Sequence, residues 1–408
     1  MSQSEFKVII VGGGPVGLVA AHALHHAGID FTVLEQHEGV FEDVGASVVI
    51  FPHNLRVLYQ LGLKERLDQI SVPMVRQFAA KSRYQTGRKL SDIEVTDAGV
   101  RVTCADGSAH SGSLVIGADG TYSNVRSIIR RNALESDPKL EASWDAEHPW
   151  LATYRCLWAS FRRPPGPDPG ANYETHAKDR SAVYLTGKDR AWIFLYEKLD
   201  KPTRERVTYD EHDAAAFARS FADWPLAEGL KVDDVLADTS FVSGMGNLDE
   251  GVASSLGELN PGVADRIGRL VLVGDSWHKF TPNAGLGLNN GIQDVVTLSN
   301  KLRSLLFEEN PRALPDTETL YAVAHGYYSD RSELLQADYK RAAQATRLAA
   351  RETTLHHILE SYVFSIDWLL GLLVNKTVAP LVKAGRVLSY IDAAEYFSGL
   401  IPWDHRLS

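Results

Sequence analysis

The chain contains little cysteine, no long apolar segment and no excess of positive charge. Only two of its 408 residues are cysteine, Cys104 and Cys156, so neither a disulfide framework nor a sulfur-rich metal site is expected. No run of about 18 uninterrupted apolar residues occurs, which leaves no plain transmembrane helix. The sequence has 42 lysines and arginines against 52 aspartates and glutamates, a net charge of −10, and this acidic balance argues against a nucleic-acid partner.

What the sequence does contain is an ordinary globular composition in a chain too long for one core. Hydrophobic residues make up 44% and charged residues 23%. A single core rarely grows beyond about 250–300 residues, so two lobes, or a core with an appendage, are expected. The first five residues are polar and lead into an apolar strand. This predicts no secretory signal and a location in the cytoplasm or on an intracellular membrane surface.

A βαβ pattern with a glycine-rich turn opens the chain. Strand, turn, helix and second strand are predicted in that order at residues 6–11, 12–17, 18–27 and 30–35. In this context Gly12 permits a tight turn, Gly14 lets a pyrophosphate approach the backbone, and Gly17 allows close helix–strand packing. Glu35 can accept a hydrogen bond from a ribose hydroxyl. The turn predicts a dinucleotide site, the alternative being a turn that binds nothing, and its expected contact residues are Gly12, Gly14, Pro15, Val16, Gly17 and Glu35.

Two further segments carry glycine and aspartate after an apolar strand. Residues 114–126 read Leu-Val-Ile-Gly-Ala-Asp-Gly-Thr-Tyr-Ser-Asn-Val-Arg, and residues 270–294 contain Gly-Asp-Ser followed by Pro-Asn-Ala-Gly-Leu-Gly-Leu-Asn. In order and spacing, the three segments resemble the signatures of the FAD-dependent aromatic hydroxylase-like (group A) flavoprotein monooxygenases. The second half most resembles the fungal branch that tailors meroterpenoid and indole-alkaloid intermediates. The resemblance covers roughly residues 6–300 and fades in the tail.

The resemblance implies an α/β fold. A Rossmann-like FAD-binding domain of the glutathione-reductase type would be interleaved with a mainly antiparallel β-sheet substrate domain and followed by a helical C-terminal tail. We expect the FAD-binding domain at residues 1–149 and 266–350, the substrate domain at 150–265 and the tail at 351–408. The aromatic-rich strand candidates of the middle region agree with the substrate domain.

The resemblance also implies a second group of cofactor residues. Asp275 would bind the ribityl hydroxyls of FAD, Pro282 would lie at the flavin face, and Asp119 and Gly120 belong to a motif tied to both FAD and NAD(P)H. The backbone N–H groups of a helix start would face the flavin pyrimidine edge at Gly285, Gly287, Leu288 and Asn289. Asp119 and Asp275 could instead cap helices or turns. His278 is expected to be structural rather than a catalytic base, and no metal site is expected.

The substrate domain offers two polar candidates. Arg155 either orients a carbonyl or phenolate near the flavin or forms a structural ion pair, and Tyr196 is a weaker handle. Because strand residues alternate between faces, Trp192, Phe194 and Tyr196 should share one side. That side either lines an apolar pocket or packs in the core.

One region departs from the family. After the helix that ends near Leu67, a family member normally continues for several dozen residues before an arginine-bearing helix that contacts FAD. Here Arg76 follows almost at once and is the candidate for that arginine. In the tail, Trp368 and Leu369–Leu373 either lie on a membrane or belong to a helical cap.

These observations give two functional hypotheses. The first is a monooxygenase that uses FAD, NAD(P)H as a transient reductant and O2 to epoxidise or hydroxylate a lipophilic secondary-metabolite intermediate through a flavin C4a-hydroperoxide. The second is a shortened flavin-fold protein without redox activity that acts as an auxiliary partner in the same pathway. A small lipophilic substrate is the expected partner.

Overall fold

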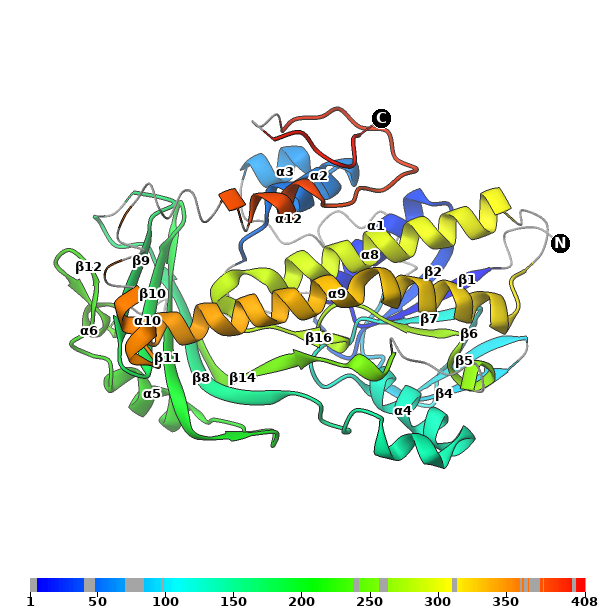
Figure 1. Ribbon diagram of the computed structural model, residues 1–408, viewed down its shortest axis with the longest axis horizontal. Helices are drawn as coiled ribbons and strands as arrows, with labels where there is room; N and C mark the ends of the chain where they lie inside the picture. Colours follow the sequence, from blue (N-terminus) through cyan, green and yellow to red (C-terminus); the bar gives the residue numbers. More distant parts are fainter. Residues whose placement is uncertain are drawn as a thin grey trace.

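In the computed structural model, the apolar strands of the first βαβ unit form the centre of a five-stranded parallel sheet (Figure 1). Its strands, in spatial order, are β15 (Leu270–Leu272), β7 (Leu114–Gly117), β1 (Lys7–Val11), β2 (Asp30–Leu34) and β3 (Tyr84–Gln85). The strands β15, β7, β1 and β2 are almost completely buried because both faces of the sheet are covered. The structure describes residues 6–39, 48–69, 84–96, 98–166, 168–237, 242–256, 263–309, 314–359, 362, 366, 375–376, 378–397 and 401–407.

Helices cover the parallel sheet, and the longest of them continues into the second lobe (Figure 1). The helices of the described residues are α1 (Pro15–His26), α2 (Pro52–Gln60), α3 (Lys64–Gln69), α4 (Asn124–Ser136), α5 (Glu211–Arg219), α6 (Val232–Leu236), α7 (Ala264–Ile267), α8 (Leu286–Ser304), α9 (Thr317–Ala349), α10 (Thr354–Ile358) and α12 (Ala379–Lys383). Helix α8 packs against both α1 and α9. A three-stranded antiparallel sheet flanks this lobe and is formed by β4 (Leu90–Thr96), β5 (Gly99–Cys104) and β6 (Ala109–Gly112).

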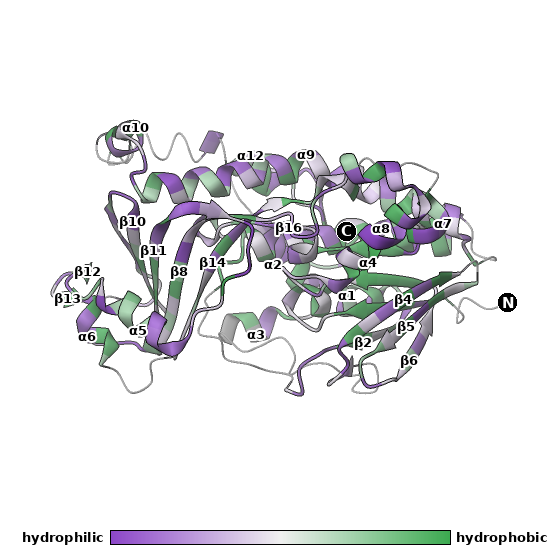
Figure 2. Cartoon of the chain, turned by 90° about the horizontal axis from the view of Figure 1, so that it is seen from below, coloured by the Kyte–Doolittle hydropathy of each residue, from purple (hydrophilic) through white to green (hydrophobic). Residues whose placement is uncertain are grey.

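The second lobe is built on a six-stranded antiparallel sheet. Its strands, in spatial order, are β16 (His278–Lys279), β14 (Val242–Val252), β8 (Leu151–Arg162), β11 (Arg190–Thr203), β10 (Arg180–Thr186) and β9 (Asn172–Ala177). One face packs against α5, α6 and the hairpin of β12 (Pro225–Ala227) and β13 (Leu230–Lys231), on the side away from the parallel sheet (Figure 2). The apolar core on that face includes Leu157, Phe161, Leu195, Phe217 and Phe221.

The carboxyl end of α9 joins this sheet to the lobe that contains the parallel sheet. The Asp179 N–H donates to the carbonyl oxygen of Ala350 at 2.7 Å, just beyond the helix. Arg347 forms an ion pair of 2.8 Å with Glu250, whose side chain is buried. Lys198 of β11 pairs with Glu352 at 2.7 Å. The two lobes are therefore joined by ion pairs and a backbone hydrogen bond.

The C-terminal segment packs over α2 as an extended strap. The Gln60 amide donates to the carbonyl oxygens of Leu388 and Ile391 and accepts the Leu388 N–H, with distances of 2.7–3.0 Å. The Arg56 guanidinium is buried, donates to Glu395 at 2.9 Å and lies 4.2 Å from the centre of the Trp403 ring. This end of the tail is thus held on the body of the protein.

The cluster from Trp368 to Leu373, the candidate for membrane contact, lies outside the described residues. Among the described residues, no helix combines the length and apolarity needed to cross a membrane.

The strap also buries a histidine on α2, which predicts acid sensitivity. Burial lowers the pKa of His53 to about 4, with smaller contributions from Arg331 and Arg56. His53 is neutral when folded but protonates when unfolded, so its stabilisation is complete above pH 6.5 and is lost as the pH falls toward 4. We expect His53→Gln to remove up to about 3 kcal/mol of this pH dependence. Urea unfolding at several pH values measures it.

Candidate functional site

The glycine-rich turn between β1 and α1 is closed at two glycines and open at a third. A Cβ on Gly12, whose φ is +102°, would lie 2.3 Å from the Ala118 carbonyl oxygen. A Cβ on Gly17 would lie 2.1 Å from the carbonyl oxygen of Gly12. At Gly14 no described atom lies within 4 Å of the Cβ position. The turn therefore packs tightly on β7 and presents bare backbone at Gly14, as a phosphate-binding turn requires.

Glu35, immediately after β2, faces this turn. Its carboxylate accepts the Gly13 N–H at 2.7 Å and the His37 N–H at 2.9 Å, and the side chain is buried. A carboxylate has about four acceptor positions, so oxygen lone pairs remain for a ribose hydroxyl.

The structure brings the three sequence motifs together. Val16, at the start of α1, packs against the third motif, because a Cβ on Gly274 or Gly291 would lie within 3.0 Å of its methyl groups. Arg126, which ends the second motif, donates to the Ser276 carbonyl oxygen at 2.8 Å. Burial lowers the pKa of this arginine to about 10. The glycine turn, the second motif and the third motif thus form one continuous site.

In the third motif, the aspartate lies beside the start of α8. Asp275 pairs with Lys279, and its carboxylate oxygen is 3.7 Å from the Cβ position of Gly287. Gly285 adopts a left-handed conformation with φ +63° and precedes the first turn of α8. Pro282 lies in the short turn just before it. The predicted residues of this motif therefore surround one helix N-terminus, whose free N–H groups favour an anion.

Asn289 has a side-chain role that its motif does not indicate. Its carbonyl oxygen accepts the Phe51 N–H and the Asn54 side-chain N–H, both at 2.8 Å. Its amide donates to the carbonyl oxygen of Val49 at 2.8 Å. The side chain thereby joins α8 to the chain entering α2, while its backbone belongs to the predicted flavin loop.

A buried charged network lies beneath the third motif. The Asp294 carboxylate interacts with His278 Nε2 at 2.6 Å, Arg331 Nε at 2.8 Å and the Gly274 N–H at 2.9 Å. Burial alone would raise the pKa of Asp294, but the charges of His278 and Arg331 and the hydrogen bonds outweigh it and lower the pKa. His278 therefore has a structural partner, and the network holds the Gly274-Asp275 turn in place.

In the second motif, Asp119 supports the N-terminus of α4, whose N-cap residue is Ser123. Its carboxylate accepts the Ser123 hydroxyl at 2.5 Å and the Val125 N–H at 3.1 Å, and burial raises its pKa. Gly120 has φ +78°, which permits the turn after it. The capping alternative is thus present in the structure. Any contact of Asp119 or Gly120 with FAD or NAD(P)H stays a prediction.

Arg155 and Tyr196 lie on opposite faces of the antiparallel sheet. In the pairing of β8 with β11, Arg155 lies opposite Glu197 and Cys156 lies opposite Tyr196. The Arg155 guanidinium donates to Glu197 at 3.0 Å and lies 4.9 Å from the Phe217 ring of α5. Tyr196 is buried on the other face, where burial raises its pKa well above 10.0. Arg155 therefore adopts the ion-pair alternative. Arg76 lies outside the described residues.

The face with Tyr196 carries a row of half-buried aromatic side chains. Trp158 pairs in register with Phe194 on one side and Gly244 on the other, and Trp192 follows two residues before Phe194. The Trp158 indole lies along β14, where a Cβ on Gly244 would approach it to 2.6 Å. We call Trp158, Trp192 and Phe194 the aromatic face; it is opposite the core under α5.

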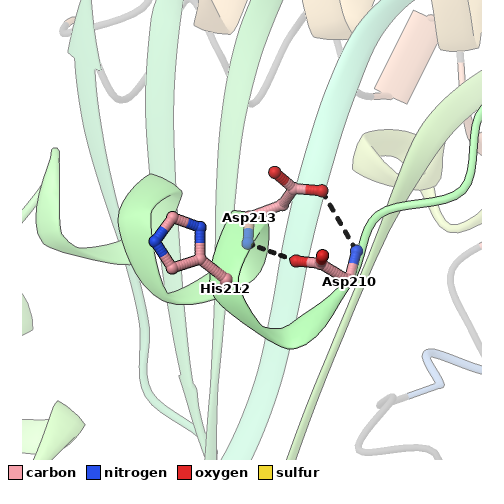
Figure 3. Close-up of side chains that lie close together, drawn as sticks. All are labelled: Asp210, His212 and Asp213. Carbon is pink, nitrogen blue, oxygen red and sulfur yellow. Dashed lines mark hydrogen bonds between the residues drawn. The ribbon is translucent and has the colours of Figure 1, made fainter.

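Acidic and histidine side chains form a cluster at the start of α5, and the capping of that helix accounts for the two carboxylates. Asp210, His212 and Asp213 lie close enough to share an ion (Figure 3). The Asp210 carboxylate accepts the Asp213 N–H at 2.8 Å, and Asp213 accepts the Asp210 N–H at 3.1 Å. This reciprocal pair is a capping box, so the two carboxylates already serve the start of the helix.

Two groups of described residues fit the two ends of FAD. The bare backbone at Gly14 and the carboxylate of Glu35 suit the pyrophosphate and adenosine ribose. Asp275 and the first turn of α8 suit the ribityl chain and flavin ring. A parallel sheet carrying this site, interleaved with an antiparallel sheet, defines a two-lobed flavoprotein with the predicted α/β fold.

Comparison with known proteins identifies the family. Residues 5–106 and 263–324 match the FAD binding domain family. FAD-dependent monooxygenase SAT1 of Stachybotrys chartarum is 41% identical over 52% of this chain and 69% of its own length. FAD-dependent monooxygenase dpchE of Colletotrichum higginsianum is 30% identical over 89% and 85%. The chain belongs to the family of FAD-dependent monooxygenases, and FAD is its cofactor.

Among solved structures, the Diels-Alderase PyrE3 of the pyrroindomycin pathway superposes with a TM-score of 0.62. The superposition covers 90% of this chain and 79% of PyrE3 at 21% identity, which shows the shared fold.

Proposed function

We propose that the protein is a single-component FAD-dependent monooxygenase that uses NAD(P)H and O2 to epoxidise or hydroxylate a lipophilic secondary-metabolite intermediate. Epoxidation of a prenyl alkene is the preferred form. The observation that carries the substrate class is the aromatic face of the antiparallel sheet, since half-buried indole and phenyl rings bind apolar, flat or branched surfaces.

The residues have distinct parts in this reaction. When bound, FAD supplies the oxygen-transfer chemistry, with electrons from NAD(P)H. The N–H groups at the start of α8 would hold the flavin and stabilise negative charge on it. Asp294 and Arg331 keep the Gly274-Asp275 turn fixed. The aromatic face binds the substrate and excludes water from it. Pro282 would shape the space next to the flavin.

The function is tested with purified protein. It should be yellow, oxidise NAD(P)H faster in the presence of prenylated compounds, and yield a product carrying one oxygen atom from isotopically labelled dioxygen. A colourless protein that gains no flavin absorbance on reconstitution with FAD would contradict the proposal.

A second candidate function rests on the short segment between Leu67 and Arg76, where family members have several dozen more residues. In this reading the chain binds FAD but acts without redox turnover, as an auxiliary or binding partner in a biosynthetic pathway. Anaerobic mixing with NAD(P)H separates the two: bleaching of the flavin absorbance supports the monooxygenase, and a persistently oxidised flavin supports the auxiliary protein.

A glycine on β14 is expected to set the shape of the substrate site. Gly244→Ala places a methyl group 2.6 Å from the Trp158 ring, so the indole must move off the strand. Overpacking of this kind costs about 1–3 kcal/mol, and we expect about a tenfold or greater loss of kcat/KM for the best prenylated substrate. FAD affinity should be unchanged. The matched variant is Gly246→Ala, whose Cβ would meet the same ring at an ordinary 3.6 Å and should have little effect.

A further inference from the structure

Tyr84 places a phenol against the glycine-rich turn, and none of the sequence motifs includes it. It begins β3 and pairs with Val33 of β2, so it lies on the strand next to the one that ends before Glu35. A Cβ on Gly13 would lie 2.2 Å from the Tyr84 hydroxyl oxygen and 2.8 Å from the ring carbon that bears it. The three nearest atoms to that Cβ position all belong to Tyr84. The hydroxyl therefore occupies the space of a side chain at position 13.

Three polar groups meet at this point. The Gly13 N–H donates to Glu35, and the Tyr84 hydroxyl lies against Gly13. Burial, followed by the charge of Glu35, raises the pKa of Tyr84 to about 12, so the phenol keeps its proton at neutral pH. A protonated phenol can donate where a carboxylate accepts. A sugar hydroxyl, which does both, matches such a pair.

We propose that Tyr84 is a ligand of the adenosine ribose of FAD: a ribose hydroxyl donates to Glu35 and accepts from Tyr84. Position 13 is then glycine because the Tyr84 hydroxyl occupies the place where a Cβ atom would lie. This inference concerns cofactor binding alone and is independent of the reaction proposed above.

Tyr84→Phe tests the hydroxyl, because it keeps the ring. The apoprotein should bind both FAD and ADP about tenfold more weakly, the loss typical of one hydrogen bond. FAD binding is followed by flavin absorbance and ADP binding by calorimetry. The control is Tyr173→Phe on β9, an exposed phenol, which should change neither affinity. Wild-type affinity for ADP in Tyr84→Phe would overturn the assignment.

Gly13→Ala tests the shared space. Its methyl group overlaps only with Tyr84 among the nearest atoms, so the variant should weaken ADP binding at least as much as Tyr84→Phe. In a Tyr84→Val background, the same substitution should cause no further loss. Independent, additive losses in the double variant would contradict the proposal. Since ADP carries no flavin, these results do not depend on whether the protein is a monooxygenase.

Discussion

An Asp294→Asn variant is expected to unfold about 3–5 kcal/mol more easily than the parent protein, because it leaves Arg331 buried without its counter-charge. The side chains of both residues are almost completely buried, with 4% of Arg331 and 0% of Asp294 exposed. Asparagine offers a single acceptor oxygen in place of two, so it cannot serve His278, Arg331 and the Gly274 N–H together. Urea unfolding of the apoprotein measures the loss.

The control for this variant is Asp330→Asn. Asp330 also carries two cationic partners, Lys301 at 3.3 Å and Arg386 at 3.0 Å, but its side chain is 34% exposed. A surface pair contributes at most about 1 kcal/mol, so this variant should be nearly neutral. Equal losses in the free energy of unfolding from the two variants would show that the buried network stabilises the fold no more than a surface ion pair does.

The same network gives a pH dependence with a definite sign. The pKa of Asp294 is lowered in the folded protein, so its stabilisation is fully present above the ordinary value of 3.8 and is lost as the pH falls through the folded value. The parent protein should therefore lose this contribution only below pH 3.8, and Asp294→Asn should lack that part of the acid transition.

The parts of the site that were predicted from the sequence depend on short-range geometry. The glycine turn, its flanking strands and Glu35 lie within 30 residues, and their spacing alone implies a βαβ unit with a phosphate-binding turn. The resemblance supplied the other two motifs; the structure packs the third against the first through Val16 and joins the second to the third through Arg126.

Relations between distant elements could not be predicted. Arg331 lies on α9, 37 residues beyond Asp294, and an arginine in a long polar helix normally indicates a solvent-facing position. The faces of Arg155 and Tyr196 depend on the register between β8 and β11, which pairs Arg155 with Glu197. A shift of one residue would exchange the two faces, and the sequence of either strand does not determine that register. Tyr84 was missed because an aromatic residue on a short strand carries no motif.

The second large effect is expected at Gly14, where binding and folding can be separated. The residue has φ −67° and ψ 178°, a backbone conformation open to alanine, and no described atom lies within 4 Å of its Cβ position. Gly14→Ala should therefore change the stability of the apoprotein by less than about 1 kcal/mol. The added methyl group occupies the backbone surface that the pyrophosphate must approach. We expect FAD affinity to fall about a hundredfold, equivalent to about 3 kcal/mol.

Gly17→Ala is the matched variant for this prediction, because it adds the same methyl group one helical turn away. Here the Cβ would lie 2.1 Å from the carbonyl oxygen of Gly12, which is backbone and cannot move without opening the turn. This variant should destabilise the apoprotein by about 1–3 kcal/mol and lose FAD as a consequence. Thermal unfolding without flavin, followed by titration with FAD, distinguishes the two. If Gly14→Ala keeps its FAD affinity, or destabilises the apoprotein as much as Gly17→Ala does, the pyrophosphate does not lie at Gly14.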